Sequence, residues 1–376
     1  MTFQNFELEY YQSLHEHEVQ FNLADSSVKC VNVREWLTDA EIEKLLDTGL
    51  FYPEVNGTKG LRDAISTLYG TGCNRDNVLV TVGASQANSL VCATLLEPGD
   101  QVVVITPGYR QVAGMARNAG CNVIEVQTRE EDGWRLDLDS LSKTVTSKVK
   151  LLAVVNPNNP TGAVFSDAEM QRIVQICAEA GCWLHADEVY QGTELEGAPT
   201  KSFWGMYERV VCTGSVSKAY GLSGLRIGWA LAAPSVVQSL WRRHEYALIA
   251  ASGPGMTLAE IALQPAKRDL LLARQRDLSH AGRAVMREWL TGQMGRITWR
   301  ESPATSIAFV RCHMNHSSWE TAEQVRKFGS VLVGPGSYLG AEGYLRITVG
   351  YDADKVREAL RRVGNVLDQM ATSAEG

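Results

Sequence analysis

The sequence predicts an α/β fold in which a mostly parallel central sheet has helices on both faces and is joined to a smaller α+β domain. Between residues 77 and 233, short apolar runs rich in β-branched residues alternate with helical stretches, as in buried parallel strands joined by crossover helices. After residue 234 the pattern changes to long helices with a few short strands. The runs that we expect to form the sheet are 78–82, 102–105, 123–126, 151–155, 183–186 and 210–213.

Composition, net charge and the lack of long apolar runs limit the kinds of protein that this sequence can encode. The chain has 376 residues, of which 45% are hydrophobic and 21% charged, so it can bury one large core and a second smaller one. Its net charge of −7 argues against nucleic acid as a partner, since binding to the phosphate backbone needs a basic surface. No apolar run is long enough to span a bilayer, and the first nine residues lack the features of a leader peptide. We therefore expect a cytoplasmic protein.

The eight cysteines are scattered, and no Cys-x-x-Cys pair occurs. We expect them to be reduced core residues rather than disulfides or zinc ligands. Cys312, His313 and His316 come nearest to a metal-binding cluster, but no second pair of ligands accompanies them. We expect no metal site.

The stretch 215–229 surrounds Lys218 with small hydroxyl residues and glycines. A lysine forms an imine only if its amine can lose its proton near neutral pH, which burial or neighbouring cations bring about. Ser215 and Arg226 would offer a bound phosphate a hydroxyl and a fixed charge. Upstream, Asp187 provides the kind of acid that keeps a pyridine ring nitrogen protonated. A Ser/Gly-rich turn with a solvated lysine is the structural alternative for the stretch.

Together these residues resemble the fold-type I pyridoxal-phosphate enzymes of the class I/II aminotransferase superfamily, over about residues 52–350. The resemblance implies pyridoxal 5′-phosphate as the cofactor, Lys218 as the lysine that binds it, and Asp187 as the partner of its ring nitrogen. It also implies that Ser215, Ser217 and Arg226 belong to the cofactor site.

The same resemblance divides the chain into three parts. Residues 1–44 form an N-terminal segment that belongs to the small domain and covers the active site. Residues 45–250 form the large cofactor-binding domain, and residues 251–376 form the small C-terminal domain.

A sheet of this kind binds ligands at the carboxyl ends of its strands. Gly83, Ala84 and Ser85 follow the first strand and open a helix, whose N-terminal N–H groups form a phosphate seat. Their position matches the family's phosphate loop. Tyr109 follows the second strand and matches the aromatic residue that stacks on the pyridine ring. Without the resemblance, residues 83–85 would be interpreted as an ordinary turn, and Tyr109 as a surface or core aromatic residue.

A rigid loop with two prolines and a glycine, at 156–162, follows another strand. Such a loop can hold an asparagine amide still enough to hydrogen-bond a ring hydroxyl. The resemblance assigns this role to Asn159, which also borders the substrate, and makes Tyr190 the second donor and a catalytic residue. The resemblance also makes Arg346, in the segment Leu-Arg-Ile-Thr, the residue that binds the α-carboxylate of the substrate. An Asn-Pro turn and a surface arginine are the structural alternatives.

The N-terminal segment is rich in acids. We expect a helix over 6–23, and a solvated helix face explains most of its carboxylates. In the superfamily this segment commonly folds over the active-site mouth, so we expect Glu9 and Asp25 to contact the distal end of a cationic substrate such as a guanidinium. The opening Phe-Glu-Leu-Glu is similar to capreomycidine-type cyclases, and Asn-Leu-Ala-Asp is similar to arginine-oxidising members.

Tyr52 precedes a proline in a loop that leads into a helix. In relatives the tyrosine of this loop reaches the phosphate in the neighbouring subunit, which implies a homodimer with shared active sites. Packing within a turn is the alternative.

Three functions remain open. In the first, removal of the Cα proton leads to transamination, in which an amino acid becomes a keto acid. In the second, an arginine-like substrate such as hydroxyarginine loses a side-chain group and a guanidine nitrogen closes a ring, as in capreomycidine or L-enduracididine synthases. The third, a non-catalytic pyridoxal-phosphate sensor, is disfavoured because no helix-turn-helix segment precedes the domain.

Overall fold

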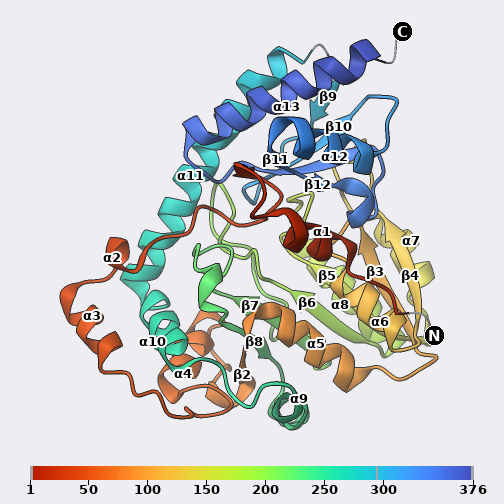
Figure 1. The fold of residues 1–376 in the computed structure, drawn as a ribbon. Helices are drawn as coiled ribbons and strands as arrows, with labels where there is room; N and C mark the ends of the chain where they lie inside the picture. The colour runs from red at the N-terminus through yellow and green to blue at the C-terminus, as the bar shows by residue number, and fades with distance from the viewer. Residues whose placement is uncertain (1–2, 294, 374–376) are drawn as a thin grey trace.

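The computed structural model describes residues 3–293 and 295–373. A large sheet lies in the lower half of Figure 1, and a smaller α+β part lies above it. This confirms the predicted fold class, an α/β protein with a mostly parallel central sheet and a smaller α+β domain.

The large sheet has seven strands in the described chain, in the order β2-β8-β7-β6-β5-β3-β4. Neighbouring strands are parallel except at β8, which pairs antiparallel with β2 and β7. The six predicted runs are confirmed as strands, and β8 is the strand that the sequence analysis missed. The bounds are β2 Val78–Thr81, β3 Gln101–Thr106, β4 Asn122–Gln127, β5 Val149–Val155, β6 Trp183–Asp187, β7 Val210–Ser215 and β8 Gly228–Leu231.

Alternate residues of the central strands pack on opposite faces of this sheet. On one face Val103 and Leu152 join the largest core cluster together with Ile173. On the other face Val102 and Leu151 pack in a separate cluster. Helices therefore cover both faces. The helices of this part are α2 Val33–Trp36, α3 Asp39–Leu46, α4 Lys59–Leu68, α5 Gly83–Leu95, α6 Gln111–Asn118, α7 Leu138–Thr144, α8 Asp167–Ala180, α9 Pro234–Ala247 and α10 Gly253–Ala262, with short 3₁₀ helices at Arg75–Asn77 and Ser223–Leu225.

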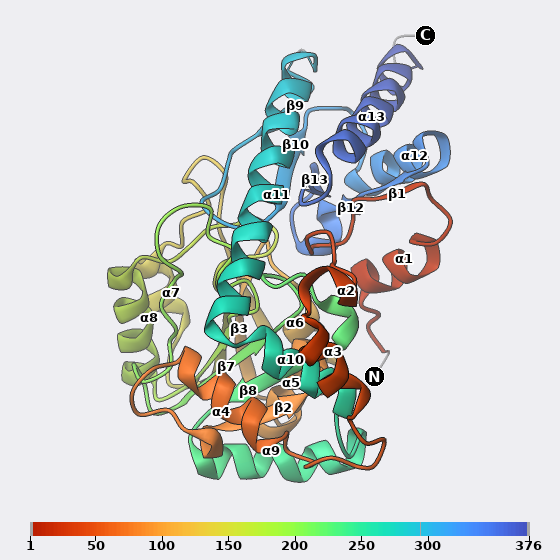
Figure 2. The same cartoon turned by 90° about the vertical axis from the view of Figure 1, so that its left-hand side faces the viewer.

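The smaller part has a core of its own, built between helices and a four-stranded antiparallel sheet ordered β12-β13-β10-β9. The long helix α11 runs from the large sheet up into this part, as Figure 2 shows. The elements are α11 Pro265–Thr291, β9 Ile297–Trp299, β10 Ile307–Cys312, α12 Ser318–Gly329, β11 Val331–Leu332, β12 Gly334–Pro335, a 3₁₀ helix Gly336–Leu339, β13 Tyr344–Thr348 and α13 Ala353–Ser373.

The N-terminal helix is shorter than predicted. Helix α1 covers Glu7–His15 rather than 6–23, and the chain then turns into β1, Phe21–Asn22. Strand β1 pairs in parallel with β11, from the far end of the chain. The backbone groups at 21–22 thus find partners in a distant strand, and helical propensity alone does not reveal such a partner.

Two further sequence expectations can be compared with the described residues. None of their helices combines the length and the apolar character needed to cross a membrane. All eight cysteines are free, but Cys30 is exposed and Cys73 partly exposed, so the expected core position applies to the six others only.

We expect opposite effects from alanine at two glycines inside helices. A Cβ atom at Gly282, in α11, would lie 1.7 Å from the Val349 carbonyl oxygen, so Gly282→Ala should cost about 3 kcal/mol of stability through backbone displacement. At Gly114, in α6, a Cβ atom meets no atom within 4 Å, so Gly114→Ala should add about 0.5–1 kcal/mol. Thermal midpoints at equal protein concentration measure both. Equal midpoints for the two variants would contradict the close α11 contact.

Candidate active site

A cavity of about 500 Å³ opens at the carboxyl ends of β5, β6 and β7. Parallel strands present their C-terminal residues at one edge of a sheet, which is where ligands bind in folds of this class. The cavity gathers most of the site residues that the sequence singled out. They are Glu9, Asp25, Ala84, Ser85, Tyr109, Asn159, Asp187, Tyr190, Ser215, Ser217, Lys218, Arg226 and Arg346.

Two predicted residues do not line the cavity. Gly83 is the first residue of α5 and immediately precedes Ala84, which lines the cavity. Tyr52 is 79% exposed and stands on the surface of the single chain, so the predicted contact with a neighbouring subunit stays a prediction.

One end of the cavity has the features of an anion site. The N-terminal residues Ala84 and Ser85 of α5 face it, together with Ser215, Ser217 and Arg226. The free N–H groups and the dipole of a helix N-terminus attract a phosphate, and a guanidinium adds a fixed charge. Among the described residues, no carboxylate pairs with Arg226, whose Nη1 donates to the Ser223 carbonyl at 2.9 Å.

Glycines allow the backbone segments to converge at this anion site. Gly83 has φ +72°, and a Cβ atom there would lie 2.3 Å from Nη2 of Arg226. At Gly228, the first residue of β8, a Cβ atom would lie 2.4 Å from the Ala84 nitrogen. Side chains at either position would push Arg226 or β8 away from the helix N-terminus.

At another wall of the cavity Asp187, the last residue of β6, is only 5% exposed. Its carboxylate accepts hydrogen bonds from Asn88 Nδ2 at 2.9 Å and from the Val189 backbone N–H at 3.1 Å. Burial raises the pKa of Asp187, while these bonds and the charge of Lys218 partly offset the rise. A protonated ring nitrogen beside this carboxylate would supply the positive partner that its burial calls for.

A buried hydrogen-bond network behind Asp187 was not predicted from the sequence. Asn88 receives a hydrogen bond at its Oδ1 from the Thr213 hydroxyl at 2.8 Å, and that hydroxyl lies 3.3 Å from Nε2 of His185. Since the hydroxyl proton goes to Asn88, the His185 ring donates through Nε2. Burial lowers the pKa of His185 to about 4, so the ring is neutral near pH 7. This network fixes the Asn88 amide, and hence the Asp187 carboxylate.

The two predicted donors to a ring oxygen both face the cavity. The Tyr190 hydroxyl is buried and has no hydrogen-bond partner among the described residues. Asn159 accepts a hydrogen bond from Nη1 of Arg346 at 3.2 Å. Arg346 itself is 1% exposed, and its Nη2 donates to the Ala24 carbonyl. A buried guanidinium with no carboxylate partner in the described residues suits the α-carboxylate of an amino acid.

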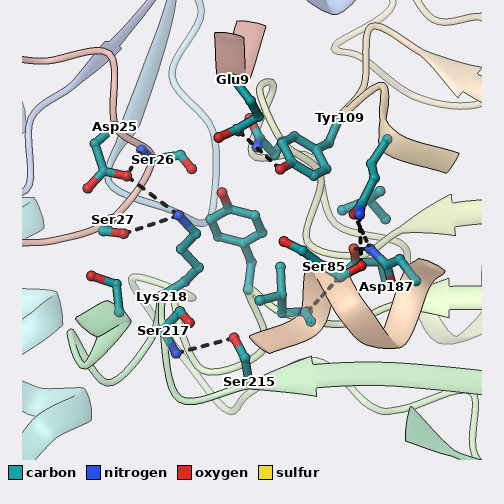
Figure 3. A pocket seen from close by; sticks show the side chains of 18 of the residues that line it. Glu9, Asp25, Ser26, Ser27, Ser85, Tyr109, Asp187, Ser215, Ser217 and Lys218 are labelled. Carbon is teal, nitrogen blue, oxygen red and sulfur yellow. Dashed lines mark hydrogen bonds and ion pairs between the residues drawn. The ribbon is translucent and has the colours of Figure 1, made fainter. Parts of the chain in front are cut away.

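The amine of Lys218 points toward the N-terminal segment (Figure 3). It lies 3.1 Å from the Ser27 hydroxyl and 3.5 Å from a carboxylate oxygen of Asp25. Burial lowers the pKa of Lys218, but the charges of Asp25, Tyr190 and Glu9 outweigh burial and raise it overall. Asp25 was expected at the distal end of the substrate, and in this structure it is the partner of the lysine.

Helix α1 closes the other side of the cavity. Its Glu9 accepts a hydrogen bond from the Tyr109 hydroxyl at 3.0 Å, and Phe6 packs edge-on against the Tyr109 ring. Gln12 and Glu16, which the sequence analysis did not single out, line the same cavity. They follow Glu9 by three and seven residues, so helical periodicity was the signal that would have found them.

The residues present fit pyridoxal phosphate. The anion site would hold the phosphate, and Asp187 would pair with the ring nitrogen. The unpartnered Tyr190 hydroxyl is a buried group that lacks the partner a ring oxygen would provide. Val155 and Val189 line the same cavity and offer apolar contact to an aromatic ring. Groups of His, Cys, Asp and Glu that could hold a metal ion do not occur among the described residues.

Comparison with known proteins agrees with this geometry. The chain is 30% identical to the aromatic-amino-acid aminotransferase 2 of Thermococcus litoralis, over 90% of this chain and 88% of that protein. It is 29% identical to the capreomycidine synthase of Streptomyces vinaceus, over 85% and 81%. A crystal structure of a PLP-dependent aminotransferase from Streptococcus suis superposes with a TM-score of 0.91 at 27% identity, covering 98% and 99% of the two chains.

The model of the family "Aminotransferase class I and II" matches residues 21–363, which include the cofactor site and most of the smaller part. The cofactor expected from the sequence is thereby confirmed as pyridoxal 5′-phosphate, and the fold as fold type I. The protein belongs to the class I and II aminotransferase family and is a pyridoxal-phosphate-dependent enzyme.

Proposed function

We propose that this enzyme removes the Cα proton of an amino acid with a cationic, arginine-like side chain, such as hydroxyarginine, and then eliminates a side-chain group and closes a ring. The observation that carries this proposal is the distribution of charge in the cavity. Cationic Lys218, Arg226 and Arg346 line the part of the cavity that would receive the phosphate and the α-carboxylate. The carboxylates of Glu9 and Glu16 line the cavity from the side of α1.

Such an arrangement favours a substrate with a negative end and a positive end. The α-carboxylate meets Arg346, whereas a guanidinium meets carboxylates that can accept paired hydrogen bonds. A neutral side chain would make no ion pair with these two acids. The similarity to capreomycidine synthase supports the same class of reaction.

Each residue has a defined task in this scheme. Arg346 orients the substrate through its carboxylate, and the amine of Lys218 takes the Cα proton as general base. Asp187 would keep the ring nitrogen protonated, while Tyr190 and Asn159 would donate to the ring oxygen. When bound, pyridoxal phosphate supplies the electron sink that stabilises negative charge at Cα.

The later steps need no oxidant. With a hydroxyl on Cβ, the Cα proton passes to Lys218, the bond between Cβ and its hydroxyl oxygen breaks, and the departing oxygen takes up a proton and leaves as water. A guanidine nitrogen then forms a C–N bond to the vacated carbon and loses its own proton, and Cα regains one. The net reaction is loss of one water with closure of a ring.

Transamination is the alternative. It uses the same groups for binding and for removal of the Cα proton, and it is supported by the similarity to the aminotransferase of Thermococcus litoralis. It differs in where the proton is returned and in the need for a keto acid as second substrate.

Substrate tests separate the two reactions. We expect the purified holoenzyme, mixed with β- or γ-hydroxyarginine and no keto acid, to form a dehydrated cyclic product over many turnovers. Arginine without the hydroxyl should give no such product, because it lacks the leaving group. Mass spectrometry measures the loss of water. Stoichiometric conversion of the cofactor to its amine form, with a keto acid as product, would instead establish transamination.

Neutralising the α1 carboxylates should select against cationic substrates. Glu9→Gln and Glu16→Gln each remove a charged acceptor, and we expect KM for the arginine-like substrate to rise about 10- to 100-fold. A neutral amino acid of similar length serves as the comparison substrate and should be affected much less. Equal losses for both substrates would contradict a role of these acids in recognising charge.

We also propose that the enzyme is a homodimer that shares its active sites. Among the described residues, exposed apolar side chains are concentrated in two stretches, 46–52 and 246–249, as expected for a surface that another subunit covers. Tyr52, within the first stretch, would reach the phosphate of the neighbouring site.

Mixing of two inactive variants tests this arrangement. Lys218→Ala lacks the base in its own site, and Tyr52→Ala lacks the donor for its neighbour's site. A mixed dimer contains one site with both groups intact, so unfolding and refolding the two variants together should restore activity that neither has alone. Sedimentation checks that each variant is dimeric. Activity that does not recover in verified mixed dimers would contradict the sharing of Tyr52.

A further inference from the structure

The Lys218 amine has two partners that the cofactor site does not require. Ser27, which is buried, offers its hydroxyl at 3.1 Å, and Asp25 offers a carboxylate oxygen at 3.5 Å. Both come from the N-terminal segment, nearly two hundred residues away in the sequence. Figure 3 shows the amine directed toward these residues and away from Ser215.

The segment that carries these partners is fixed to the smaller part of the molecule. The Ala24 carbonyl accepts from Arg346, and the Asp25 carbonyl accepts from the Thr348 hydroxyl. The Ser26 backbone N–H donates to the Asp25 carboxylate at 2.6 Å, which sets the orientation of that side chain. Asp25 and Ser27 are therefore held in place rather than presented by a loose loop.

We propose that Asp25 and Ser27 form a cradle that receives the Lys218 amine when it is not bonded to the cofactor and stabilises the ammonium ion that the amine becomes when it takes up a proton. The proposal rests on the proposed role of Lys218 as the base. Asp25 and Ser27 act through Lys218 and are positioning residues.

The charges around the amine support an ammonium in the cradle. Asp25 and Glu9 face it from the N-terminal segment and α1, Tyr190 and Asp187 face it from the end of β6, and Arg346 opposes it from β13. Burial raises the pKa of Asp25, but Lys218 and Arg346 outweigh this and lower it overall, so the carboxylate is ionised at neutral pH. A carboxylate 3.5 Å from an amine favours its protonated form.

The cradle has a consequence for the proton taken from the substrate. As the Cα–H bond breaks, its proton forms an N–H bond on Lys218, and the new ammonium is stabilised next to Asp25. This makes Lys218 a stronger base. The proton is also held on the side of the cavity formed by the N-terminal segment, where a departing hydroxyl can take it up and leave as water.

The test measures how readily Lys218 loses its proton in the full-length apoenzyme. Only the neutral amine attacks the aldehyde of pyridoxal phosphate, so below the pKa of Lys218 the rate of cofactor attachment rises with pH. We compare the wild type with Asp25→Asn and Ser27→Ala, following the visible absorbance of the lysine-linked cofactor. In the first variant the introduced amide oxygen can still accept from the Ser26 N–H, which preserves the local fold.

We expect Asp25→Asn to move the profile about one pH unit lower, so that attachment at neutral pH is about tenfold faster. Ser27→Ala should move it in the same direction by less, because a hydrogen bond to an uncharged hydroxyl stabilises an ammonium ion less than a carboxylate does. The plateau at high pH should stay the same, since the neutral amine is equally reactive in all variants.

Two controls identify the cause of any change. Glu16→Gln also removes one negative charge from the cavity, but Glu16 does not contact Lys218. This variant therefore measures the general effect of charge on the binding of an anionic cofactor. We expect it to leave the position of the profile on the pH axis unchanged. Lys218→Ala should develop no lysine-linked absorbance. If it does, the assignment of Lys218 itself is wrong. If Lys218→Ala develops no such absorbance but the Asp25→Asn profile coincides with that of the wild type or of Glu16→Gln, the cradle is refuted while the assignment of Lys218 stands.

Discussion

The buried guanidinium of Arg346 is the constraint on which the site depends. It lies on β13, is 1% exposed, and has no carboxylate within ion-pair distance among the described residues. Its Nε also lacks a partner there. Burying an unpaired charge costs several kcal/mol, which supports the proposal that an anionic group of the substrate pairs with this guanidinium. Through Asn159 and Ala24 the same guanidinium joins the loop after β5 to the N-terminal segment.

The N-terminal segment gives the cavity its acidic side. Its backbone pairs with β11, and two of its acids meet groups of the cofactor site, Glu9 at Tyr109 and Asp25 at Lys218. In the large part, by contrast, strand ends and a helix N-terminus supply the anion site and the Asp187 carboxylate. The proposed cofactor environment thus comes mainly from the large sheet, whereas the acids that we propose to recognise the substrate come from α1 and its C-terminal end.

The hydrogen-bond network from His185 through Thr213 and Asn88 to Asp187 explains how a carboxylate can be held rigidly at the end of a strand. These residues come from β6, β7 and α5, so three elements fix one acid. A ring nitrogen placed against that acid meets a preorganised partner, and no reorientation is needed when charge develops on the ring.

The sequence by itself determined the strands of the sheet, the order of their helices and the residues that gather at the strand ends, because burial patterns and turn chemistry are local properties. Together with the family resemblance, it identified most of the cavity, from Lys218 and Asp187 to Arg346. It missed β8, whose four residues follow a glycine-rich stretch, and it extended the first helix past His15. Only the tertiary structure decided the pairing of β1 with β11, the partners of Asn88 and the contact of Asp25 and Ser27 with Lys218. Each of these joins residues far apart in the sequence, and periodicity carries no information about which distant segment supplies a hydrogen-bond partner.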